Sequence, residues 1–155
     1  MVFGNTGYAE SKDKTATQIT TLDWENLIPD GYDASEKIDE LKKQLSQYRD
    51  NDPKAMEIYG NIEAELDNAP VNTSLDGKLI KMPGFIAPLD VSKDEVTEFL
   101  LVPYYGACIH LPPPPMNQTV FIKADKGQGV KFEDVNLPVW ITGTLRAVAE
   151  RTEIG

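Results

Sequence analysis

The sequence predicts an α+β protein, in which an N-terminal antiparallel helical hairpin packs on a small, strongly bent β-barrel similar to an OB-fold. Three observations predict this class. Apolar residues recur at spacings of three and four between about residues 35 and 67, as on an amphipathic helix. Short runs rich in β-formers follow. Glycine and proline interrupt these runs, which favours a curled sheet over a flat one.

The chain begins with a polar stretch that has no hydrophobic period. Residues 1–21 are rich in Gly, Ser, Thr and Lys, so we expect a flexible arm there. Residues 22–155 have the length of a single domain. Trp24 lies beside two aliphatic residues, Leu27 and Ile28. It either anchors the arm to the core or stacks on a ligand.

Two helices are expected between residues 33 and 68. Asp33 or Ser35 can cap the first helix, and Asp52 with Pro53 can begin the second. The short link at 49–51 makes the helices an antiparallel hairpin. Their charged outer faces indicate a solvated exterior, and a partner-binding coiled coil is the alternative. The expected apolar stripes are Ile38, Leu41, Leu45 and Tyr48 on the first helix, and Met56, Tyr59, Ile62 and Leu66 on the second.

The barrel is expected over about residues 71–150. Bulges at Gly84 and Gly143 would supply the bends that a small barrel requires. A hairpin turn around Gly127 and Gly129 separates the last two strands. The strands themselves are expected at 78–89, 98–103, 119–124 and 139–145.

Charge excludes two common classes of partner. The chain carries 25 acidic and 15 basic residues, a formal charge of -10, and would repel nucleic acids and anionic lipid surfaces. No run of 18 apolar residues is present, so no membrane-spanning segment is expected.

The most distinctive segment joins the chain's single cysteine and single histidine to a run of prolines. On an extended backbone Cys108 and His110 point to the same side, while Pro112, Pro113, Pro114 and Pro115 stiffen the exit. Thiolate and imidazole are ligands of zinc or copper, so these two residues are candidate metal ligands. Two alternatives remain open: the pair is structural, or His110 activates Cys108 as the nucleophile of a cysteine-dependent enzyme.

A candidate ligand or partner patch surrounds this pair. Aromatic side chains contribute area and hydroxyl groups to binding surfaces, and amide side chains contribute hydrogen bonds. The patch comprises Tyr104, Tyr105, the prolines at 112–115, Asn117 and Gln118.

Three segments carry a distinctive pattern: Gly84–Leu89, the segment Phe99–Gln118 that contains the Cys-x-His-x-Pro-Pro-Pro-Pro-x-Asn-Gln core, and Pro138–Leu145. Together they resemble DUF3299, a family of uncharacterised bacterial envelope proteins. The resemblance covers about residue 22 to the end of the sequence. Members are typically exported proteins or lipoproteins, often encoded near ABC-transporter components, with an OB-like barrel and no established enzymatic activity.

The resemblance therefore implies a periplasmic or lipid-anchored accessory or binding module whose partner belongs to an ABC-type transport system. Met1–Ser11 has no basic region of a signal peptide, so we expect that a signal segment has been removed. Family members usually continue beyond the strand that ends at Leu145 with a Gly-Tyr segment. Since this sequence stops at Gly155, we expect a barrel that is open at one edge.

Overall fold

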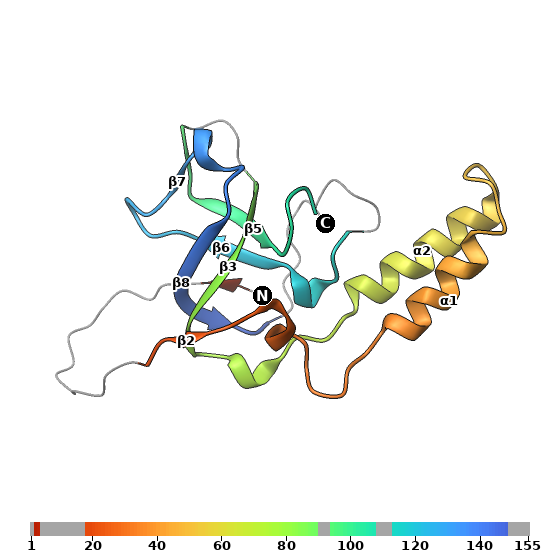
Figure 1. Ribbon diagram of the computed structural model, residues 1–155, viewed down its shortest axis with the longest axis horizontal. Helices are drawn as coiled ribbons and strands as arrows, with labels where there is room; N and C mark the ends of the chain where they lie inside the picture. Colours follow the sequence, from red (N-terminus) through yellow and green to blue (C-terminus); the bar gives the residue numbers. More distant parts are fainter. Residues whose placement is uncertain (1, 4–17, 90–93, 108–112, 149–155) are drawn as a thin grey trace.

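The structure is a computed structural model that describes residues 2–3, 18–89, 94–107 and 113–148. It confirms the mixed α+β class: a pair of helices extends from one side of a body that is mostly β-sheet (Figure 1). The helices are α1 (Ser35–Leu45) and α2 (Pro53–Asp67). The strands are β1 (Val2–Phe3), β2 (Thr20–Thr21), β3 (Leu79–Pro88), β4 (Glu95–Val96), β5 (Glu98–Val102), β6 (Val120–Lys123), β7 (Val130–Lys131) and β8 (Val139–Arg146). Short 3₁₀ helices lie at Trp24–Leu27, Thr73–Leu75, Met116–Gln118 and Phe132–Asp134.

The two helices begin as the sequence predicts. Asp52 caps α2 by accepting a hydrogen bond from the N–H of Lys54, with Pro53 in the first helical position. Asp33 accepts a hydrogen bond from the N–H of Ser35 at 2.8 Å, although the N-cap position of α1 is Ala34. The first helix ends at Leu45, whereas the predicted apolar stripe of this helix extends to Tyr48.

The apolar stripe of α2 is displaced from the predicted one. Ile62 and Leu66 are buried as expected, but Ile58 lies beside them in place of Met56 and Tyr59, which are exposed. Residues 58, 62 and 66 repeat every four positions and so follow one helix face closely. The stripe packs against α1, and its cluster is separate from the cluster inside the sheet. Packing of the helical pair on a barrel is therefore not confirmed.

The main sheet has the strand order β2-β3-β5-β6-β1-β8, and β4 pairs with β7 apart from it. The long strand β3 changes partner along its length, because residues 79–84 pair with β8 and residues 85–88 pair with β5. The sheet bends around one hydrophobic cluster, which includes Phe99, Leu101 and Leu145 (Figure 1). Two short strands, β1 and β2, lie within residues 1–21, where no element is predicted.

Trp24 holds the start of the domain against β3. Its Nε1 donates a hydrogen bond to the carbonyl oxygen of Pro83 at 3.0 Å, and its ring packs on the cluster inside the sheet. The anchor interpretation of Trp24 is thereby confirmed. Gly84 is required by close packing, since a Cβ at this position would lie 2.6 Å from Cγ of Leu101 and 3.0 Å from Cζ2 of Trp24.

A closed OB-like barrel is not established. The strand β1 lies between β6 and β8 but pairs with only two residues of each. Farther along β6 and β8, no strand of the described residues lies between them. The OB-like barrel accordingly remains a prediction, whereas the α+β class is shown.

Candidate functional site

Three of the predicted site residues lie outside the residues that the structure describes. These are Cys108, His110 and Pro112. The metal site and the thiol–imidazole pair therefore remain predictions. Within the described residues, no group of three or more His, Cys, Asp and Glu side chains is placed to hold a metal ion.

The two tyrosines of the predicted patch are at the surface. Tyr104 and Tyr105 follow the end of β5, with 48% and 60% of their surfaces exposed. The ring of Tyr105 meets Phe85 of β3 edge to face, with ring centroids 6.3 Å apart. Its hydroxyl donates a hydrogen bond to Oδ1 of Asn136 at 3.2 Å. These contacts hold the ring in one orientation, since both its edge and its hydroxyl group have partners.

The two amide residues of the predicted patch face inward. Asn117 is 1% exposed and donates from Nδ2 to the carbonyl oxygen of Pro70, 3.1 Å away. Gln118 donates from Nε2 to the carbonyl oxygen of Trp24 at 2.8 Å. Pro113, Pro114 and Pro115 are half-buried before the 3₁₀ helix that contains both amides. Both amides therefore join elements distant in the sequence, and their role in a binding patch remains a prediction.

Sequence reasoning missed Trp140, an exposed aromatic side chain of the sheet. Trp140 on β8 is 58% exposed and lies opposite Pro83 of β3 in the strand register. Nζ of Lys81 lies 5.0 Å from the centroid of the Trp140 ring, in a cation–π contact. Strand alternation places Lys81, Pro83 and Phe85 on the same outer face of β3. In β8, Trp140 and Thr142 are exposed while Ile141 is half-buried. The sequence signal for Trp140 is therefore the two-residue alternation of a strand, which puts it on the same face as the polar Thr142.

We call these side chains, together with Tyr104, the aromatic strip. It runs from β8 across β3 to the loop after β5, and it consists of Lys81, Phe85, Tyr104, Tyr105 and Trp140. Aromatic side chains in this arrangement offer large apolar faces with polar groups at their edges. The strip overlaps the predicted patch at Tyr104 and Tyr105.

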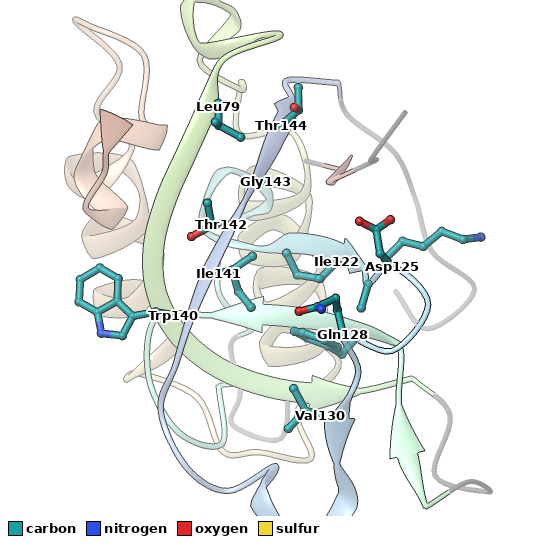
Figure 2. Close-up of a pocket in the computed structure, with 13 residues that line it drawn as sticks. Leu79, Ile122, Asp125, Gln128, Val130, Trp140, Ile141, Thr142, Gly143 and Thr144 are labelled. Atoms are coloured by element: carbon teal, nitrogen blue, oxygen red, sulfur yellow. The ribbon is translucent and has the colours of Figure 1, made fainter. Parts of the chain in front are cut away.

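A cavity of about 460 Å³ lies beside β8 (Figure 2). Apolar side chains that include Ile122, Val130 and Ile141 line it, together with the polar residues Asp125 and Gln128. Trp140 also belongs to its lining, although in Figure 2 its side chain lies apart from those of Asp125 and Gln128. The cavity and the aromatic strip therefore adjoin at Trp140 of β8.

Two ionisable groups at the beginning of α1 have shifted pKa values. Burial and the charge of Glu65 raise the pKa of Tyr32 above its ordinary value of 10.0. Hydrogen bonds from the side chain and the backbone of Ser35 lower the pKa of Asp33 from its ordinary value of 3.8. Tyr32 and Asp33 lie next to the helical pair, and neither residue is part of the aromatic strip or of the cavity lining.

The fold and its surfaces define a class of α+β proteins with a strongly curved sheet, a projecting helical pair and an exposed aromatic strip. The family model "Protein of unknown function (DUF3299)" matches residues 24–155, so the chain belongs to the DUF3299 family. A crystal structure of a DUF3299 family protein from Pseudomonas aeruginosa PAO1 is similar, with 38% sequence identity and a TM-score of 0.57. The similarity covers 83% of this chain and 81% of that one.

No curated protein matches the chain. In the part of the chain that the structure describes, neither helix combines the length and the apolar character that crossing a membrane requires.

Proposed function

We propose that this protein is a non-enzymatic binding module that recognises a protein partner through the aromatic strip. The observation that carries the proposal is the exposure of Trp140 and Tyr105, two large aromatic side chains that contact Lys81 and Phe85 on one face of β3. Tyrosine and tryptophan are enriched among the residues that dominate protein–protein binding energies. Exposed apolar patches with polar edges are typical of such interfaces.

The strip is also held in place before binding. Phe85 and Asn136 contact Tyr105, and Lys81 covers the face of Trp140. Rings that are already fixed lose less conformational freedom when a partner binds. The basic side chain of Lys81 gives the strip a positive group on an otherwise acidic protein, which favours a partner with a carboxylate near its own apolar contact.

The resemblance adds a narrower proposal. The protein is exported and its partner belongs to an ABC-type transport system of the bacterial envelope. Its support is the family's usual setting near transporter components, and the aromatic strip is compatible with any protein partner.

Affinity capture from an extract of the source organism tests the main proposal. The double variant Tyr105→Ala/Trp140→Ala should recover at least about tenfold less of any partner that wild type captures, because truncating interface anchors typically costs 2 kcal/mol or more. Met56→Ala is the matched control, since Met56 is 69% exposed on α2 and lies outside the strip. Equal recovery by the double variant and wild type would remove the aromatic strip as the binding surface.

Metal handling is a second proposal, and it rests on the sequence alone. Zinc or copper would bind Cys108 and His110, with further ligands from a carboxylate, water or a second subunit. Native mass spectrometry of wild type and of Cys108→Ser in the presence of zinc checks it. A zinc adduct of equal abundance in both proteins would contradict it.

A further inference from the structure

The aromatic strip lies on an outer face of the sheet. Lys81, Pro83 and Phe85 share this face of β3, because they alternate with buried residues along the strand. Backbone hydrogen bonds lie in the plane of a sheet, whereas side chains stand out of it. A ligand on this face therefore meets side chains, and its own backbone groups must be satisfied internally or by water.

Two aromatic positions of the strip are separated by about one turn of a polyproline II helix. Trp140 lies opposite Pro83, and Phe85 is two residues farther along β3. Neighbouring strands are about 4.8 Å apart and two strand residues span about 6.7 Å, so the Cα atoms of Trp140 and Phe85 are about 8 Å apart on a regular sheet. A polyproline II helix repeats every three residues, or about 9 Å. Residues three positions apart in such a helix therefore match the two positions.

The rings of the strip suit proline side chains. Trp140 and Tyr105 are 58% and 60% exposed, and the ring of Tyr105 is supported by Phe85. Proline-rich segments dock on exposed aromatic side chains, and their polyproline II backbone has no internal hydrogen bonds and stays hydrated. Such a segment needs no backbone partner from the strip. Its conformation is also largely formed before binding, so it loses little conformational freedom.

The two ends of the strip differ in charge. At one end, Nζ of Lys81 lies 5.0 Å from the centroid of the Trp140 ring. At the other end, Tyr105 donates a hydrogen bond to Asn136, which closely follows Lys131–Asp134, a segment with one basic and two acidic residues. A complementary ligand carries a carboxylate at the Trp140 end and a basic group at the Tyr105 end.

We propose that the aromatic strip binds a proline-rich segment of a partner protein in the polyproline II conformation, with a carboxylate beside Lys81. This inference rests on the proposed function, because it specifies the partner of the same surface. Prolines three positions apart contact Trp140 and the pair formed by Phe85 and Tyr105.

An amphipathic helix fits this face less well than a proline-rich segment. A helix docks through an apolar stripe that needs a continuous hydrophobic groove. Beside Trp140, the outer face carries the exposed polar residues Lys81 and Thr142, which lie opposite each other in the strand register. These polar groups interrupt a groove but leave single rings accessible, as a polyproline II ligand requires.

Fluorescence anisotropy with the labelled peptide Glu-Pro-Pro-Ala-Pro-Pro-Lys tests the inference on the full chain. The control peptide carries leucine at each proline position, which keeps the apolar area and both charges but removes the preformed conformation. We expect at least about fivefold weaker binding of the leucine peptide. Equal binding of both peptides, or binding of neither, would overturn the inference.

Four variants locate the bound peptide. Trp140→Ala and Tyr105→Ala should each weaken binding at least about tenfold, because each removes a ring that contacts proline. Lys81→Glu should weaken binding of the same peptide and strengthen binding of a peptide that begins with Lys in place of Glu. Met56→Ala, on the exposed face of α2, should leave the affinity unchanged. Unaltered affinity in Trp140→Ala, or no reversal of the charge preference in Lys81→Glu, would show that the peptide binds elsewhere.

Failure of this inference is distinguishable from failure of the proposed function. If Tyr105→Ala/Trp140→Ala loses a captured partner while no proline peptide binds to wild type, the strip recognises another kind of segment and only the inference is overturned. If the double variant captures as much partner as wild type, both are overturned.

Discussion

Asn117 and Pro70 are joined by a hydrogen bond across 47 residues of sequence. The side-chain Nδ2 of Asn117 donates to the Pro70 carbonyl oxygen at 3.1 Å, and Asn117 is almost completely buried. Pro70 lies three residues after the end of α2, so this bond joins the exit of the helical pair to the segment before β6. A buried amide at this position fixes the segment that follows α2 relative to the segment that precedes β6.

Replacing Asn117 by alanine should therefore destabilise the protein. The carbonyl oxygen of Pro70 would lose its donor, and we expect a loss of about 1–3 kcal/mol in the free energy of unfolding. Urea unfolding measured by circular dichroism checks this value. Asn51→Ala, in the exposed link between the helices, is the control and should change stability by less than about 0.5 kcal/mol. Equal midpoints for Asn117→Ala and wild type would show that the bond has no structural role.

Two glycines should respond to alanine substitution with opposite signs. At Gly84 the added Cβ lies 2.6 Å from Cγ of Leu101, so we expect a destabilisation of about 1–3 kcal/mol from overpacking. At Gly60, inside α2, no atom lies within 4 Å of the added Cβ. Alanine there should stabilise by about 0.5–1 kcal/mol through its higher helix propensity. Thermal unfolding of both variants checks the pair, and a neutral Gly84→Ala would contradict the packing argument.

Gly84 also shows what sequence can and cannot predict. The sequence suggests a bulge or a sharp bend at Pro83–Gly84, whereas the register with β8 is regular up to Gly84, and β3 pairs with β5 from Phe85 onward. The need for glycine comes from Leu101 and Trp24, which reach it from distant parts of the chain. Local patterns predict β3 and both helices because their signals lie within one turn or a few strand residues.

The site was less predictable for the same reason. Tyr104 and Tyr105 could be selected from their neighbours in the sequence, but Trp140 joins them only through the pairing of β8 with β3. The inward position of Asn117 likewise depends on Pro70. The neighbourhood of β6, β1 and β8 in the sheet is likewise a long-range arrangement that no local motif encodes.

The carboxyl group of Asp33 should titrate below its ordinary range. The Ser35 side chain, then the Ser35 backbone, lowers the pKa of Asp33 in the folded state. The resulting stabilisation is complete above the ordinary value of 3.8 and is lost as the pH falls through the lower folded-state pKa. NMR titration of the Asp33 carboxyl group should show a pKa that rises toward 3.8 in Ser35→Ala. Ser46→Ala, just after α1, should leave it unchanged, and an unshifted pKa in wild type would contradict the argument.

The helical pair should unfold independently of the sheet when its own cluster is weakened. Ile62 is 2% exposed and packs between α2 and α1, in a cluster separate from the one inside the sheet. Ile62→Ala should destabilise the pair by about 2–5 kcal/mol, while Met56→Ala on the exposed face should have almost no effect. Hydrogen exchange measured by NMR distinguishes local from global unfolding. We expect amide protection to fall throughout α1 and α2 and to persist in β3 and β8. An equal loss of protection in β3 and β8 would show that helices and sheet form a single cooperative unit.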